Sequence, residues 1–265
     1  MRRKDNCLMV SDTITYEQPL NERMRVFLRM EFLFSQVSHY INGSSEWDNR
    51  NAISALIEIV DFITRSDIKT ELIKELERHA STLNALVNSP AVDNRRLAAI
   101  LDKIDTFLAK LRDASCQPGQ ILRQNEFLMT IKQRNSIPGG TCNFDIPGYF
   151  FWLNKSSQVK TADLQKWQSD LLLLKDSIRL SLQMIRNSNT PSNEQAERGF
   201  YQKQIEANVA CHLIRVVLPG STKYYPEISG GKHRFAIRFM EQPTTSDRPA
   251  QTRDTVKFEL HCCIL

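Results

Sequence analysis

Over the first two thirds of the chain, apolar residues recur every three or four positions, which is the period of amphipathic helices. Asn21, Asp67 and Asp93 each precede such a segment and are suited to capping a helix N-terminus. The segments predicted as helices are residues 21–40, 48–64, 67–87, 93–111, 124–134, a helix that begins at 145–147, and 161–186. Because short polar loops connect most of them, we expect an antiparallel helical bundle.

In the last third of the chain the period changes to two, as in β-strands. Residues 209–217 are apolar on both sides, which is typical of a covered central strand. Residues 200–204 and 256–262 also suit strands, whereas the polar segment 187–199 predicts a loop. Residues 13–17 alternate in the same way but have no neighbouring strand in the sequence, so we expect them to join the C-terminal sheet.

Helices first and strands last indicate an α+β protein, with an N-terminal helical bundle domain followed by an antiparallel β-sheet domain that the N-terminal strand joins. We place the helical domain at residues 19–190, and the β-domain at residues 200–265 together with strand 13–17. The first helix is apolar on most sides, and such a helix either lies centrally or packs against a second copy. We therefore expect the helical domain to carry the dimerisation surface.

One strand, predicted within residues 232–240, separates its side chains by chemistry. Its faces carry Phe235, Ile237 and Phe239 on one side, and Arg234, Ala236 and Arg238 on the other. Four residues at about 3.3 Å each place the two arginine stems roughly 13 Å apart. The small side chain of Ala236 leaves a shallow basic notch between them, which could receive an acidic peptide or a phosphate chain.

A structural interpretation of these arginines stands beside the functional one. Arginines on the exposed face of an antiparallel strand are often only solvated, or they pair across the sheet with an acid such as Glu259 or Glu17. Such exposed pairs contribute little to stability. The strand alone does not choose between the two interpretations.

Composition places any binding role in a local patch. The 35 Lys and Arg residues exceed the 30 Asp and Glu residues by only five, which is too mild an excess for a protein that coats nucleic acid. The apolar run at residues 7–10 is too short for a signal peptide, and no stretch has the apolar length of a membrane span. We therefore expect a cytosolic protein without a membrane partner.

No motif indicates catalysis or metal binding. The sequence lacks a nucleophile elbow, a zinc-protease helix, a phosphate-binding loop and a dinucleotide fingerprint. The six cysteines include no C-x-x-C pair, and neighbours such as His261, Cys262 and Cys263 point to opposite faces of a strand. We expect free thiols, no metal, no cofactor and no enzymatic activity.

Four segments, taken in order, resemble the ZapD family, the FtsZ-associated cell-division proteins of Gram-negative bacteria. They are LNERMRVFLRMEFL at residues 20–33, KTELIKEL at 69–76, SIPGG at 136–140, and YPEISGGKHRFAIRFM at 225–240. The resemblance spans nearly the whole chain. It implies a two-domain α+β homodimer that is not an enzyme.

The resemblance also implies a function and a site. It implies binding to the C-terminal tail of FtsZ, the tubulin-like GTPase of the division ring. It further implies cross-linking of FtsZ filaments into bundles that stabilise this ring at mid-cell. The implied pocket for the tail is basic and corresponds to Arg65, Arg234 and Arg238 in this sequence. We add Lys232 because of its place beside the strand.

The alternative function is a nucleic-acid-binding module that uses the basic strand 232–240. Proteins that bind single strands combine cationic side chains with aromatic rings on which bases stack. Here Phe235 and Phe239 lie on the face opposite the arginines, so they cannot form such a platform beside them. We therefore expect no nucleic-acid partner.

Overall fold

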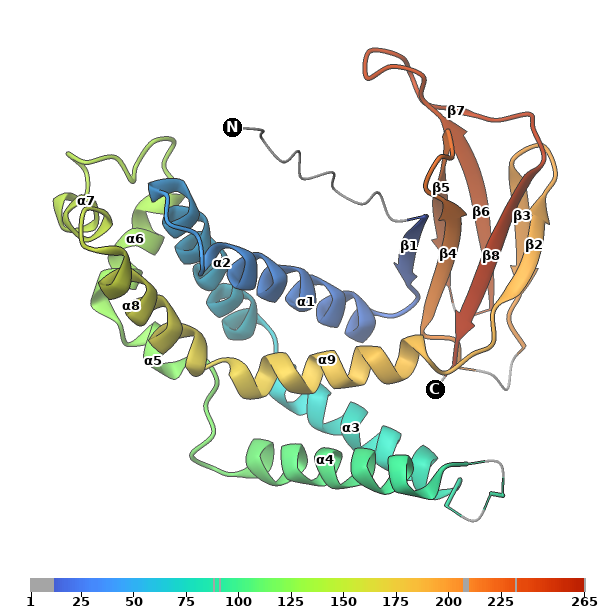
Figure 1. The fold of residues 1–265 in the computed structure, drawn as a ribbon, viewed down its shortest axis with the longest axis horizontal. Helices are drawn as coiled ribbons and strands as arrows, with labels where there is room; N and C mark the ends of the chain where they lie inside the picture. Colours follow the sequence, from blue (N-terminus) through green and yellow to red (C-terminus); the bar gives the residue numbers. More distant parts are fainter. Residues whose placement is uncertain (1–11, 88, 91, 207–209, 232, 265) are drawn as a thin grey trace, which may run out of the picture. The chain divides into compact units, whose positions relative to one another are not determined.

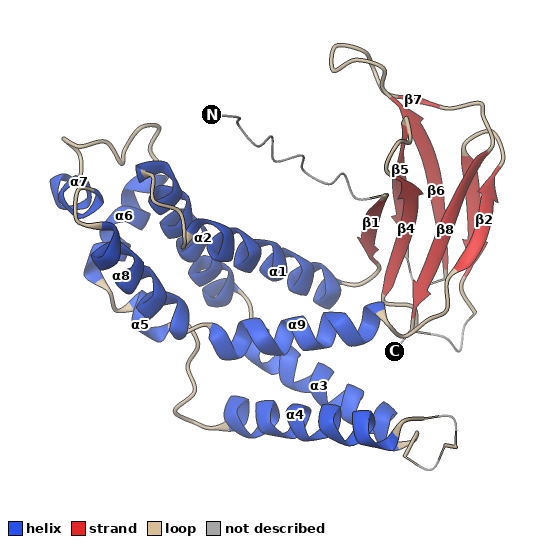
Figure 2. Ribbon diagram, viewed as in Figure 1, coloured by secondary structure: helices blue, strands red, loops and turns tan. Residues whose placement is uncertain are grey.

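Figure 1 shows the computed structural model, which describes residues 12–87, 89–90, 92–206, 210–231 and 233–264. The chain divides into two compact units. One is the helical unit Val26–Leu182, and the other, here called the β unit, joins the residues up to Arg25 with Gln183–Leu265. Helices precede antiparallel strands along the chain, so the predicted α+β class is confirmed (Figure 2).

Local capping chemistry sets the start of most helices. The helices are α1 (Glu22–Tyr40), α2 (Glu46–Arg65), α3 (Ile68–Asn84), α4 (Asn94–Arg112), α5 (Gln120–Arg123), α6 (Glu126–Asn135), α7 (Pro147–Leu153), α8 (Ser157–Ser169) and α9 (Leu172–Arg186). Asp67 and Asp93 cap α3 and α4 as predicted, and the Asn21 side chain accepts from the Met24 amide at 2.9 Å. Helix α2 begins earlier than predicted because Ser45 forms a capping box with Asp48.

One helix prediction is wrong. The segment 161–186 forms two helices, α8 and α9, which are separated at Asp170 and Leu171. The Asp170 carboxylate accepts a hydrogen bond from the Ile121 amide at 2.9 Å, at the start of the short helix α5. Burial raises the pKa of Asp170, while the backbone hydrogen bonds from Ile121 and Leu122 act in the opposite direction. The helix predicted at 124–134 is confirmed as α6, which begins two residues later because Asn125 caps it.

The β unit contains two antiparallel sheets. The first has the order β1 (Thr13–Pro19), β4 (Leu213–Pro219), β8 (Val256–Cys263) and β2 (Ser192–Ala196). The second has the order β3 (Phe200–Gln204), β6 (Arg234–Glu241) and β5 (Tyr224–Gly230), with β7 (Ala250–Gln251) also paired to β6. Strand β1 pairs with β4 along its whole length, so the prediction that the N-terminal strand joins the C-terminal sheet is confirmed.

Two strand predictions need correction. The polar segment 187–199 is not only a loop, because it contains β2, which pairs with β8 at the edge of the first sheet. Only Ala196 of this strand is buried, and such a polar edge strand gives little hydrophobic signal in the sequence. The predicted central strand 209–217 is displaced: β4 begins at Leu213, and Val209 lies outside the described residues.

The two sheets pack face to face around an aromatic and aliphatic core. The ring centroids of Phe239 on β6 and Phe258 on β8 are 5.0 Å apart, and Tyr201 meets Phe258 edge-on at 5.3 Å. Phe235, Ile237 and Phe239 are fully buried, as the alternation along β6 predicts. The other face of β6 is thereby turned outwards. Within the described ranges, no helix is both long and apolar enough to cross a bilayer.

A cluster of charged side chains lies on the outer face of the first sheet. Glu17 on β1 accepts two hydrogen bonds from Arg186, each at 2.8 Å, and one from the Arg215 Nε at 2.9 Å. The side chains of all three residues are less than a quarter exposed. We expect Glu17→Gln to lower the free energy of unfolding by about 2 kcal/mol, because two part-buried guanidinium groups lose their counter-charge.

Chemical denaturation measures this effect, and Glu227→Gln on the exposed face of β5 is the control. The control is expected to change stability by less than about 0.5 kcal/mol. Equal stability of Glu17→Gln and the native chain would show that the cluster contributes nothing net.

Candidate functional site

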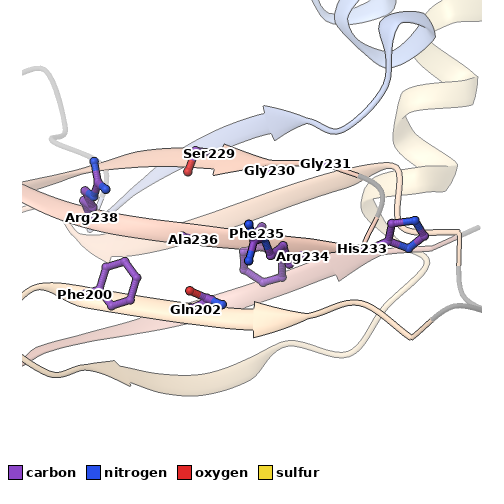
Figure 3. Close-up of a pocket in the computed structure, with 10 residues that line it drawn as sticks. All are labelled: Phe200, Gln202, Ser229, Gly230, Gly231, His233, Arg234, Phe235, Ala236 and Arg238. Carbon is purple, nitrogen blue, oxygen red and sulfur yellow. The ribbon is translucent and has the colours of Figure 1, made fainter.

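The outer face of the β3-β6-β5 sheet carries a pocket of about 530 Å³. Figure 3 shows β6 at its centre, with β3 on one side and β5 on the other. Its main lining residues are Arg234, Ala236 and Arg238 from β6, Phe200 and Gln202 from β3, and Ser229 from β5. The pocket lies wholly within the β unit, which is built around the buried aromatic side of the same strand.

Both arginines of β6 point to this pocket face. Arg234 and Arg238 are exposed, and Ala236 between them is half-buried. Because the alanine side chain is small, it leaves the space between the two arginines open. Their separation follows from the strand rise and is roughly 13 Å. The structure thus brings Arg234 and Arg238 together in one pocket.

The acids considered as cross-strand partners are engaged elsewhere. Glu17 binds Arg186 and Arg215, and Glu259 lies 2.7 Å from the Nε2 atom of His261. Among the residues that the structure describes, no acid forms an ion pair with the Arg234 or Arg238 side chain. The nearest acid in the register is Glu227, which pairs with Arg238 across β5 and β6. Both guanidinium groups therefore remain available to an anionic ligand.

Sequence reasoning missed the aromatic residue on this face. Phe200 pairs with Arg238 across β3 and β6, and directly opposite residues of an antiparallel pair share one face of the sheet. Phe200 is 40% exposed. The aromatics of β6 itself do lie on the opposite face, as predicted, but the neighbouring strand supplies a ring beside the arginines. Only the pairing of the strands reveals this arrangement.

The remaining predicted residues lie elsewhere. Lys232 is outside the described residues, and its neighbour His233 is exposed at the end of the pocket. Arg65 is the last residue of α2 and belongs to the helical unit. There it lines a second pocket, of about 550 Å³, with Lys69 and Arg123. This second pocket is also basic, although the Lys69 ammonium already donates to the Cys116 carbonyl at 2.7 Å.

Metal-ligating side chains do not gather in the described part of the chain, where no three His, Cys, Asp or Glu residues are placed to share an ion. At the C-terminus, His261 interacts with Glu259, and Cys263 is fully buried. Burial raises the pKa of the Cys263 thiol to about 11, so this thiol stays protonated at neutral pH. A protonated, buried thiol is neither a good nucleophile nor a good metal ligand.

Comparison with known proteins gives a consistent result. A family model described as "ZapD: Cell division protein" matches residues 28–238, which include the β6 arginines and Arg65. Cell division protein ZapD of Methylococcus capsulatus is 39% identical over 256 residues, covering 97% of this chain and 100% of the relative. Cell division protein ZapD of Coxiella burnetii is 40% identical over 256 residues, covering 96% and 99%. The protein of that name from an Azoarcus species is 37% identical over 252 residues, covering 95% and 100%.

Proposed function

The chain belongs to the ZapD family of cell division proteins, and from this premise we propose that it binds the C-terminal tail of FtsZ in the pocket of Arg234 and Arg238. The observation that carries this proposal is the pair of exposed guanidinium groups on β6, which have no acidic partner among the described residues. Membership of the family indicates a role in cell division. The FtsZ tail is proposed as the ligand because the sequence resemblance described above implies it.

Charge-assisted hydrogen bonds give the pocket its chemistry. A guanidinium group presents paired N–H donors that match both oxygens of a carboxylate, and these bonds are stronger than those between neutral groups. The FtsZ tail, as the resemblance implies, is a flexible segment with acidic and apolar residues. Ordering such a segment costs part of the interaction free energy, so a single site binds weakly.

Two sites on one particle convert weak binding into cross-linking. In a homodimer formed through the helical domain, each copy offers one pocket to a different filament. Once one tail is bound, the second site acts at a high effective concentration, so the dimer bundles filaments without any new contact. The protein then acts in the cytoplasm at the mid-cell division site as a binding protein, with no catalytic step and no cofactor.

Arg65 is included in the proposal as a second contact for the tail. It lines the basic pocket of the helical unit with Lys69 and Arg123, where a carboxylate would also be favoured. A position at the C-terminal end of α2 gives Arg65 a structural role as well, because a cation there complements the helix dipole. Its contribution to binding is therefore expected to be smaller than that of either β6 arginine.

Fluorescence anisotropy of a labelled FtsZ tail peptide tests the proposal directly. Titration with the native chain is expected to give saturable binding that weakens as salt is added, because the attraction between exposed charges is screened. The control peptide has each acidic residue replaced by its amide and is expected not to bind. Absence of binding by the acidic peptide, or equal binding of both peptides, would refute the proposal.

A second candidate function is the binding of single-stranded nucleic acid. It is favoured by Phe200, which is exposed beside Arg238 and could stack on a base. We rank it second because single-strand binders use several aromatic rings in succession, and the comparisons give a cell-division family. Competition separates the two functions: an oligonucleotide that binds with a steep salt dependence and is not displaced by the tail peptide would favour nucleic acid.

Removing the charge of Glu227 is expected to strengthen binding of the tail, whereas removing an arginine weakens it. It lies across from Arg238, where its negative charge repels the carboxylates of an acidic ligand. We expect Glu227→Gln to tighten tail binding about two- to fivefold, corresponding to about 0.5–1 kcal/mol. The same anisotropy titration at low salt measures it. Unchanged or weaker binding would mean that the carboxylates of the tail do not approach Arg238.

A further inference from the structure

The two ends of the β6 pocket differ in chemistry. At the Arg238 end, the residue directly opposite on β3 is Phe200. At the Arg234 end, the residue opposite on β3 is Gln204, and on the other side the Gly231 amide donates to the Arg234 carbonyl at 3.0 Å. One end therefore combines a cation with an aromatic ring, whereas the other combines a cation with polar and small neighbours.

The backbone holds Phe200 firmly in place. Its amide donates to the Glu197 carbonyl at 3.0 Å, and the preceding Gly199 donates to Asp254 and accepts from Phe239. Gly199 has a φ of 67°, and a Cβ atom there would lie 2.7 Å from the Thr252 carbonyl oxygen, so only glycine fits this turn. A ring on so fixed a backbone loses little conformational freedom on binding, which is the property of an anchor residue.

Exposure marks Phe200 as a contact surface. Its neighbour Tyr201 points the other way and packs against Phe235 and Phe258 in the core, so the strand already has its buried aromatic residue. Phe200 leaves 40% of its surface in water next to the exposed guanidinium group of Arg238. An apolar side chain of a ligand would remove that surface from water while its neighbouring carboxylate binds the arginine.

From this geometry we infer that the pocket is selective for an acidic peptide in an extended conformation that carries an apolar side chain beside only one of its carboxylates. Phe200 is the residue that determines this selectivity, and it fixes the direction of the peptide along β6. An extended peptide has the same rise as β6, so carboxylates four residues apart match the two arginines. The inference rests on the proposed function, because it names the pattern that the same pocket would read in the FtsZ tail.

Two synthetic labelled peptides test the pattern without the tail. Both carry two aspartates four residues apart in a Ser and Gly background. One has a leucine two residues from one aspartate, on the same face of the extended chain, where the other has a serine. With the native chain, the leucine peptide is expected to bind about fivefold tighter. With Phe200→Ala the two peptides are expected to bind equally, and with Phe200→Leu most of the preference should return.

Salt dependence and a matched variant separate this role from a structural one. Phe200→Ala removes no charge, so the salt dependence of binding should stay as in the native chain, whereas Arg238→Gln should reduce it. Gln195→Ala, at an exposed position of β2 in the other sheet, is the control and should keep the preference for leucine. If Phe200→Ala folds poorly, Phe200→Gln is a second variant that also removes the aromatic ring. Glutamine already occurs at two other positions of this edge strand, Gln202 and Gln204.

The outcomes for the tail and for the synthetic peptides are distinguishable. If the FtsZ tail binds the native chain and Phe200→Ala equally, the inference is overturned while the proposed function stands. If the tail fails to bind but the leucine preference depends on Phe200, the inference holds and the proposed function is overturned. If neither synthetic peptide binds, or if the preference survives in Phe200→Ala and Phe200→Gln, Phe200 does not select the ligand.

Discussion

Arg234→Glu and Arg238→Glu are each expected to weaken binding of the FtsZ tail peptide by roughly 100-fold, which corresponds to about 3 kcal/mol. Each change removes a forked, charge-assisted interaction and puts a negative charge where a carboxylate of the tail must lie. Neither arginine has an acidic partner among the described residues, so the substitutions leave no unpaired charge in the protein. Thermal denaturation of Arg234→Glu should therefore match that of the native chain, whereas Arg238→Glu should unfold at a slightly lower temperature because its new carboxylate lies opposite Glu227.

A charge reversal elsewhere is the control for this experiment. Arg95→Glu on α4 is exposed, belongs to the helical unit and changes the net charge by the same two units. It is expected to weaken binding less than about threefold, because long-range attraction is small at physiological ionic strength. If Arg95→Glu weakens binding as much as Arg238→Glu, net charge rather than the pocket attracts the tail.

The parts of the fold that depend on neighbouring residues could be predicted from the sequence. The two faces of β6 follow from alternation along one strand, and the helix starts at Asn21, Asp67 and Asp93 follow from side chains that reach amides two or three residues away. In each case the stabilising contact lies within a few residues. Hydrophobic period and capping chemistry are sufficient to find such features.

The features that could not be predicted depend on residues far apart in the chain. The break between α8 and α9 involves Asp170, whose partner Ile121 lies on α5. The candidate pocket required the pairing of Phe200 with Arg238, which joins β3 and β6 across 38 positions. Neither residue carries a local signal for its partner, because long-range strand register is set by packing of the whole sheet. The sequence therefore predicted the cations of the pocket but not its apolar side.

Filament bundling is expected to respond to pocket mutations more steeply than tail binding does. Cross-linking requires two occupied sites on one particle, so a 100-fold loss at each site compounds when both must be filled. We expect native protein to move FtsZ filaments into a low-speed pellet, Arg95→Glu to do the same, and Arg238→Glu to leave them in the supernatant. An excess of free tail peptide should dissolve the bundles formed by the native protein.

Mixing native and Arg238→Glu chains then measures how many sites a cross-link needs. If chains pair at random into dimers, an equal mixture holds about a quarter of its dimers with two intact pockets, and bundling should fall to about that fraction of its native level when dimers limit the pellet. If each chain acted alone, half of the activity would remain. Dimers with one intact pocket would still occupy tails, so they should also slow bundling by the native dimers. Retention of half or more of the pellet in the equal mixture would contradict a two-site cross-link and require another contact between filaments.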